Sequence, residues 1–302
     1  MKKTLLILIG LVVLIYGVLT VIDTKSEYIL EKKLWRIQKD FVAIAQDPKA
    51  APDNQYNEAI AKYRKLIAKY PKARLTPQMY FQIGRLEEMR KNFDGARAVF
   101  QETAEAFKDN NSIVADAMSR AGLAFEQQGK PADAIAVYTE IVRIFPKTRV
   151  GFSMPIYIAS VYRRLGDPVK QNQALAEAEK FYNEILKQTE DGSYPQIEVL
   201  RSLATVLIGQ QKWDASYQVL ERTLLTFARS QYLRPQSAAG LVRTLSVVGA
   251  GQLNDMARVN RTFDLFKEQN PDHPLNGYLE QVKASLKQFK EDQKKAAAKA
   301  NE

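Results

Sequence analysis

The stretch "AGLAFEQQGKPADAIAVYTEIVRIFP", residues 121–146, contains two short helical patterns separated by a turn signal. In both halves, apolar residues recur at steps of three and four, which places them on one face of a helix. Gly129 suits the end of the first helix, because glycine readily adopts the left-handed conformation that closes many helices. Pro146 marks the end of the second helix, since proline cannot continue one. The stretch therefore predicts a helix, a tight turn and a second helix.

The pattern of the second helix recurs along most of the chain, at intervals of about 35 to 45 residues. Each copy has a small residue, or valine in the last copy, followed four positions later by a large apolar one, and several copies end at a proline. A unit of two helices repeated at this interval predicts an α-solenoid, in which each pair packs only on its neighbours. The copies include Ala59, Tyr63, Leu66 and Pro71; Ala96 and Phe100; Ala134, Tyr138, Ile141 and Pro146; Ala178, Tyr182 and Ile185; and Val259, Phe263, Phe266 and Pro271.

These positions resemble the tetratricopeptide repeat, whose pattern of small, aromatic, small, aromatic and proline matches Gly122, Phe125, Ala134, Tyr138 and Pro146. The resemblance covers residues 54–272, with about five to six helix pairs. The "YPKA" and "FPKT" junctions look most like membrane-anchored bacterial envelope members of this superfamily. The resemblance implies an all-α fold that binds other proteins. Two insertions, in residues 167–173 and 248–254, leave the register open there.

The N-terminal region predicts a membrane anchor. Residues 5–22, "LLILIGLVVLIYGVLTVI", carry no charge and would form a helix about 27 Å long. This run is longer than that of a cleavable signal peptide, so we expect residues 1–23 to be an uncleaved signal anchor. Lys2 and Lys3 should stay in the cytoplasm, which places the rest of the chain in the periplasm of a bacterium, attached to the inner membrane.

The regions that flank the solenoid are also predicted to be helical. Residues 24–53 are expected to form a membrane-proximal helix and a linker, and within them residues 28–44 show an apolar heptad seam. The seam either joins two copies as a homodimer or packs as the first helix of the solenoid. At the other end, residues 273–289 are expected to form a capping helix, followed by a flexible tail rich in Lys and Ala at 290–302.

Composition excludes several classes of chemistry. The chain has no cysteine and one histidine, His273, which is expected to be an ordinary loop residue. No catalytic motif, phosphate-binding loop or metal-ligand cluster is recognisable, so no enzyme activity, metal or cofactor is expected. The net charge of +10 could serve nucleic acid, lipid or acidic proteins. Basic and aromatic residues do not interleave as a nucleic-acid surface requires, so nucleic acid is not an expected partner.

The resemblance implies that the first helix of each pair lines a ligand groove. It nominates eight groove residues, and the arginines among them suit carboxylates, which predicts acidic segments or C-terminal carboxylates as ligands. The alternative is that the arginines pair with Glu88, Glu126 and Glu198 across the groove. The eight candidates are Phe81, Gln82, Arg85, Arg120, Tyr157, Arg163, Arg164 and Arg201.

Three functions are compatible with these patterns. The first is a periplasmic interaction scaffold for envelope assembly, secretion or quality control. The second is an accessory protein of the translocon that binds exported unfolded chains, as a chaperone does. The third reverses the topology and gives a cytosol-facing receptor or nucleic-acid-binding solenoid. Fold alone does not choose among them.

Overall fold

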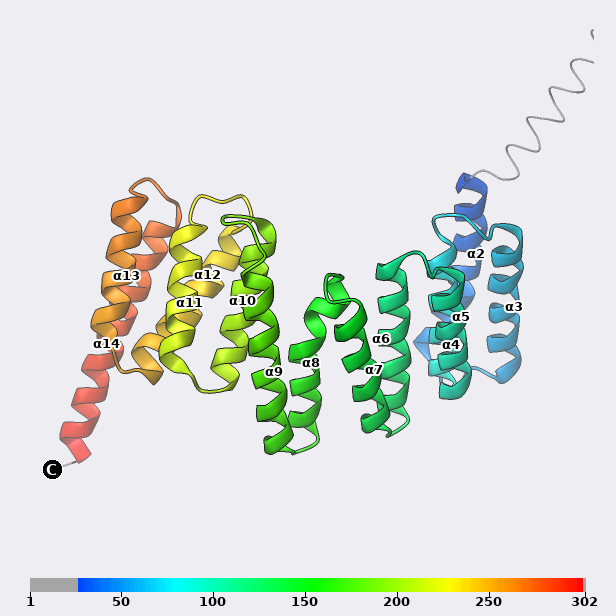
Figure 1. Cartoon of the computed structure of the whole chain (residues 1–302), viewed down its shortest axis with the longest axis horizontal. Helices are drawn as coiled ribbons and strands as arrows, with labels where there is room; N and C mark the ends of the chain where they lie inside the picture. Colours follow the sequence, from blue (N-terminus) through cyan, green and yellow to red (C-terminus); the bar gives the residue numbers. More distant parts are fainter. Residues whose placement is uncertain (1–26, 301–302) are drawn as a thin grey trace, which may run out of the picture. The chain divides into compact units, whose positions relative to one another are not determined.

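The computed structural model describes residues 27–300, and nearly all of them lie in helices joined by short turns (Figure 1). Over that range there are thirteen α-helices, one short π-helix and no β-strand. The chain divides into two compact units, one ending at Met154 and the other beginning at Pro155, within helix α8 (Arg149–Arg164). We call them the first and second units.

In the first unit, helices that are adjacent in sequence are also neighbours in space. Contacts join α2 to α3, α3 to α4, and so on through α6 and α7. Such local contacts are the mark of a solenoid. Besides the start of α8, the elements are α2 (Glu27–Gln46), α3 (Asp53–Lys69), α4 (Thr76–Met89), α5 (Phe93–Ala106), α6 (Asn111–Gln127) and α7 (Pro131–Ile144).

The second unit repeats this arrangement and ends in a longer helix. It contains the rest of α8, α9 (Pro168–Leu186), α10 (Tyr194–Gly209), α11 (Trp213–Thr226), α12 (Pro235–Ser246), the π-helix η1 (Val247–Gln252), α13 (Met256–Gln269) and α14 (Leu275–Ala300). The described residues thus hold six helix pairs, from α2–α3 to α12–α13, which confirms the all-α, tetratricopeptide-like solenoid.

The turn signals in the sequence lie where helices end. Pro71 and Pro146 follow α3 and α7 by two residues, as expected. Gly129, after α6, has a φ of 79°, and Gly166, after α8, has a φ of 70°. After α4 the same left-handed turn is made by Lys91, with a φ of 63°, although a side chain makes this conformation costly. The turn geometry is therefore shared even where glycine is absent.

Close contact between a ring and a backbone holds the paired helices together. A Cβ atom added at Gly84 of α4 would lie 2.3 Å from the Phe100 ring of α5. At Gly122 of α6 it would lie 2.3 Å from the Tyr138 ring of α7. Equivalent rings are fully buried on other second helices: Tyr63, Tyr182 and Phe263.

The fifth pair departs from this pattern. Leu220 takes the ring's position on α11, and Tyr217, one turn earlier, is the buried aromatic instead. The Tyr217 ring packs against the first helix of the following pair, where a Cβ atom added at Gly249 would lie 2.6 Å from the ring. Gly249 belongs to η1, where the backbone turn is widened. The insertion expected at residues 248–254 is thus absorbed partly as a π-helix, and the one at 167–173 coincides with a longer α9.

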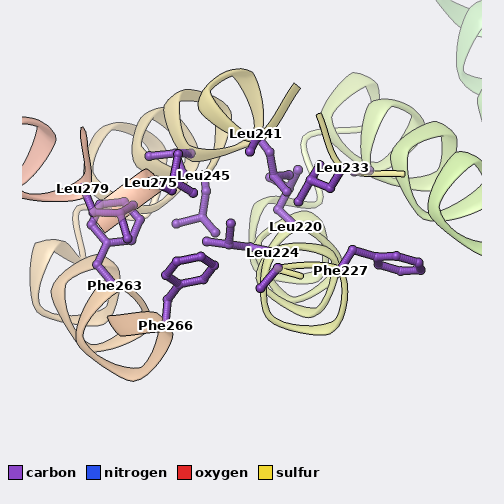
Figure 2. Close-up of a cluster of buried hydrophobic side chains, with 14 of the residues drawn as sticks. Leu220, Leu224, Phe227, Leu233, Leu241, Leu245, Phe263, Phe266, Leu275 and Leu279 are labelled. Carbon is purple, nitrogen blue, oxygen red and sulfur yellow. The ribbon is translucent and has the colours of Figure 1, made fainter. Parts of the chain in front are cut away.

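The core of the second unit extends onto α14 (Figure 2). Leu224 of α11, Leu245 of α12 and Phe266 of α13 lie in one cluster with Leu275 and Leu279 of α14. The first turns of α14 therefore cap the last helix pair, as predicted. The helix does not end at residue 289, however, but continues to Ala300. Lys, Ala, Gln and Glu all favour helix, and no glycine or proline interrupts them, so the flexible tail proposed from residue 290 is not seen up to Ala300.

At the other end, α2 packs as the first helix of the solenoid. The five apolar residues of its heptad seam are all buried in a cluster with α3 and α4. The seam is therefore not available to a second copy, and the homodimer proposed through that seam is not supported. The seam residues are Leu30, Leu34, Ile37, Phe41 and Ile44.

The predicted anchor, residues 1–23, lies outside the described residues. Within residues 27–300, no helix combines the length and the apolar character needed to cross a membrane.

The ring contact at Gly122 predicts a large effect of a single methyl group. Gly122→Ala should lower the free energy of unfolding by about 1 to 3 kcal/mol, because the new Cβ would overlap the Tyr138 ring. The control is Gly277→Ala in α14, where a Cβ meets no atom within 4 Å. That change should stabilise the chain by about 0.5 to 1 kcal/mol through helix propensity. Urea unfolding of both variants measures the difference, and equal stabilities would contradict the proposed contact.

Candidate functional site

A groove lies between α10 and α12, the first helices of the last two pairs. Its volume is about 540 Å³, and all of its lining residues belong to the second unit. The lining from α10 includes Arg201, Ser202, Thr205 and Ile208, and that from α12 includes Gln236, Ser237, Gly240, Leu241 and Thr244. Ile156 of α8, Glu198, Ala204, Leu220 and Leu233 complete it.

Most of the groove is apolar or small. Ile208, Leu220, Leu233 and Leu241 supply apolar surface, while a Cβ added at Gly240 would meet no atom within 4 Å. Two hydroxyl groups donate hydrogen bonds within their own helices. Thr205 Oγ1 donates to the Arg201 carbonyl oxygen at 3.0 Å, and Thr244 Oγ1 donates to the Gly240 carbonyl oxygen at 3.0 Å. Such a surface can pack against apolar side chains and accept hydrogen bonds from a peptide backbone.

A buried tyrosine beneath the groove holds two of its walls together. Tyr182 of α9 is fully buried, and its hydroxyl hydrogen-bonds with the Ser202 side chain and the Ile156 backbone. Burial raises the pKa of Tyr182 far above its ordinary value, so the hydroxyl stays neutral at physiological pH. Because Ser202 and Ile156 both line the groove, Tyr182 fixes α10 relative to this part of α8.

The charges in the groove cancel. Arg201 Nη1 lies 3.1 Å from Glu198 Oε1, one helical turn away, and both side chains are partly exposed. They are the two charged residues of the lining. Arg201 thus pairs with Glu198, one of the glutamates considered, but within α10 and not across the groove.

Two exposed tyrosines stand where the groove-forming helices begin. The rings of Tyr194 and Tyr232 have centroids 5.5 Å apart, and both are solvent-accessible. Tyr194 starts α10, and Tyr232 adjoins Leu233 of the groove lining. Amphipathic rings of this kind are enriched at binding surfaces. The sequence analysis missed this pair, since the start of α10 and the segment before α12 are far apart in sequence.

The other candidates of the second unit lie on α8. The Arg164 guanidinium lies over the Tyr157 ring at 5.4 Å and donates to Ser160 Oγ at 3.2 Å. Arg163 is exposed, and in residues 27–300 its side chain has no ion-pair or hydrogen-bond partner. None of these three candidates lines the groove between α10 and α12.

In the first unit, two of the candidates are half-buried on α4. Phe81 packs beside Phe100, with ring centroids 6.3 Å apart. The Gln82 Oε1 atom is buried without a hydrogen-bond partner among the described residues.

Arg85 and Arg120 both influence one glutamate. Arg85 lies over the Phe41 ring at 5.2 Å, and Arg120 is exposed on α6. Burial raises the pKa of Glu88, while the positive charges of Arg120 and Arg85 oppose that shift. The pairing weighed for Glu88 therefore holds in part, as an electrostatic interaction. Glu126, the third glutamate considered, accepts a hydrogen bond from the Tyr138 hydroxyl at 2.7 Å.

His273 has a structural role beyond that expected of an ordinary loop residue. Its Nδ1 accepts a hydrogen bond from the Leu275 backbone N–H at 3.1 Å, and its Nε2 lies 2.8 Å from the Ala228 carbonyl oxygen. The ring also packs edge-on against Phe266, with centroids 5.2 Å apart. His273 thus joins the start of α14 to the loop after α11. Across residues 27–300, no group of acidic or histidine side chains could hold a metal ion.

Comparison with known sequences identifies the repeats. Residues 53–111 and 116–148 match family models described as Tetratricopeptide repeat. The comparison with curated proteins gives no match.

Solved structures with a similar arrangement of helices share little sequence with this chain. BtubC from P. vanneervenii is 12% identical over 77% of this chain and 90% of its own, with a TM-score of 0.48. A tetratricopeptide repeat protein from Parabacteroides merdae is 12% identical over 88% and 90%, with a TM-score of 0.40. PilF of Pseudomonas aeruginosa is 13% identical over 83% and 97%, with a TM-score of 0.37. At these values, the structures carry no argument about a partner or pathway.

The raised pKa of Glu88 predicts a pH-dependent effect on stability. The folded chain binds a proton at Glu88 at a higher pH than the unfolded chain does, so stability falls as pH rises from 4.5 through the folded-state pKa. Glu88→Gln removes that loss and should raise the melting temperature at pH 7.5 but not at pH 4.

The control is Glu140→Gln, because hydrogen bonding to Arg143 lowers the pKa of Glu140. Its contribution is present above the ordinary pKa and is lost as pH falls, so this variant should show the opposite sign. Melting curves across this pH range measure both variants. A Glu88→Gln variant that is less stable than the parent at pH 7.5 would show that the two arginines outweigh burial.

Proposed function

Because the chain carries tetratricopeptide repeats, we propose that it is a non-enzymatic interaction scaffold, anchored in the bacterial inner membrane with its repeats in the periplasm. Tetratricopeptide repeats bind other proteins through the surfaces that stacked helix pairs create. The observation that carries the proposal is the groove between α10 and α12, which is open and lined by both helices. It would hold an extended segment of a partner protein.

The lining of the groove favours selection by shape and apolar contact. Since Arg201 and Glu198 pair with each other, an anionic ligand gains no net attraction from them. Small residues such as Ser237 and Gly240 leave space for side chains of the bound segment. The acidic segments or C-terminal carboxylates expected from the arginine row would instead contact Arg163, which has no carboxylate partner within residues 27–300.

A chaperone-like accessory role at the translocon is the second candidate. It is favoured by the apolar part of the same lining, since contacts with apolar side chains discriminate weakly between sequences. The two roles differ in the range of partners. One stable partner at the groove supports the scaffold, whereas many unrelated unfolded chains at the same position support the chaperone.

Filling the groove should abolish binding without harming the fold. In Gly240→Leu the new side chain would occupy the open space beside Gly240, while leucine favours helix over glycine. A photo-crosslinking residue at Ser237 should give adducts in intact cells with the parent, and these should disappear in Gly240→Leu.

The matched control is Gly277→Leu on α14, outside the groove, where a Cβ also meets no atom within 4 Å. It should leave the adducts intact. If the Ser237 adducts persist when the groove is filled and both variants keep the parent's melting temperature, the groove is not the binding site.

The proposed anchoring predicts how truncated and fused chains behave. Deletion of residues 1–24 should give a soluble helical protein, because the solenoid buries its own core from α2 onward. Alkaline phosphatase fused after residue 302 should be active on the full chain, since that enzyme folds only in the periplasm. A truncated chain that precipitates unfolded would contradict the domain boundary, and an inactive fusion would contradict the topology.

A further inference from the structure

The outward face of α2 is apolar where the end of a solenoid is expected to be polar. Tyr28, Trp35 and Val42 are 70%, 61% and 46% exposed, and they follow one another at intervals of seven residues. Because two helical turns separate them, they form one stripe on the side opposite the buried seam. Terminal repeats need a polar outer face for solubility. We therefore expect another molecular surface to cover this stripe.

The stripe is accompanied by positive charge. Lys39 Nζ lies 4.0 Å from the centroid of the Trp35 ring, a cation–π contact on the surface. Trp35, Lys39 and Val42 also line a shallow hollow of about 330 Å³ formed by α2 alone. The exposed basic residues on this helix are Lys32, Arg36 and Lys39.

The acidic side chains of residues 28–46 are already paired within the chain. Asp40 accepts from Lys62 of α3 at 2.7 Å, and Glu31 lies 3.5 Å from Arg74. Lys32 and Arg36, by contrast, have no ion-pair partner within residues 27–300. The outward side of α2 thus presents uncompensated positive charge next to exposed aromatic rings.

The position of α2 in the chain points to lipid. The uncharged run ends at Ile22, and α2 begins at Glu27. Four intervening residues span at most about 14 Å, so an anchor in the membrane keeps the start of α2 close to the lipid headgroups. Tyrosine and tryptophan favour the membrane–water interface, and lysine and arginine near it attract anionic headgroups.

A second copy of the chain fits this face less well. Three apolar side chains along one helix of about 30 Å bury far less than the roughly 1,200 Å² that a stable interface needs. A lipid surface imposes no such minimum, because the anchor already holds the chain at the membrane.

We propose that the outward face of α2 binds the surface of an anionic membrane. Tyr28, Trp35 and Val42 lie at the boundary between headgroups and acyl chains, and Lys32, Arg36 and Lys39 contact the headgroups. The inference rests on the membrane anchoring proposed above, which brings α2 to the bilayer, and it assigns the α2 face a role separate from the groove.

The test uses the full chain with Trp213→Phe, which leaves Trp35 as the one tryptophan. The protein is reconstituted into vesicles of phosphatidylcholine with phosphatidylglycerol, some of whose acyl chains are brominated near the headgroup. Bromine quenches only fluorophores within contact range. Trp35 emission should shift to the blue and be quenched by the brominated lipid, and both effects should weaken in phosphatidylcholine alone and at high salt.

Charge reversal provides a matched comparison. Lys39→Glu should reduce the quenching of Trp35, whereas Lys65→Glu, an exposed lysine on α3, should leave it unchanged. Both variants should retain the parent's circular dichroism spectrum and should still float with the vesicles, since the anchor is intact.

The outcomes separate the two proposals. If the protein floats with the vesicles but Trp35 emits as it does in detergent, anchoring holds and the α2 proposal is wrong. If the protein does not float at all, the anchoring proposal fails and the α2 proposal fails with it. If Trp35 is shielded from a water-soluble quencher but not quenched by brominated lipid, protein covers the face, which also overturns the proposal.

Discussion

The close approach of an aromatic ring to the backbone of the neighbouring helix sets the geometry of the repeats. At Gly84 and Gly122 the rings of Phe100 and Tyr138 occupy the space where a Cβ would stand. Because protein interiors are densely packed, this contact fixes the separation of the two helices of a pair. In the second unit, Tyr182 joins the helices by hydrogen bonds as well. In that unit, the position of the α10 wall of the groove depends on the buried Tyr182, which hydrogen-bonds with Ser202.

The pairing of the helices was predictable from the sequence because it depends on local signals. Helical periodicity placed Tyr63, Phe100, Tyr138, Tyr182 and Phe263 on buried faces, and all five are buried. The prolines at 71 and 146 lie just beyond α3 and α7, as a residue that lacks a backbone N–H requires. Each signal acts within a few residues, so one sequence was enough to read it.

What could not be predicted depends on contacts between distant residues. The burial of Tyr217 against η1 accompanies the widened turn at Val247–Gln252, and this contact joins residues that are far apart in the sequence. The groove itself depends on which small residues of α10 and α12 face each other. Of the eight predicted site residues, only Arg201 lines it. The resemblance to a repeat family predicted which helices line a groove. It did not predict which of their side chains are exposed in it.

The two hydrogen bonds of His273 have a chemical consequence for the C-terminal helix. Since Nδ1 accepts from the Leu275 N–H, its lone pair must be free, and Nε2 must carry the proton that is donated to the Ala228 carbonyl. Only one neutral tautomer of the imidazole satisfies both partners. The two segments that His273 joins, the start of α14 and the loop after α11, therefore fix the tautomer of its ring.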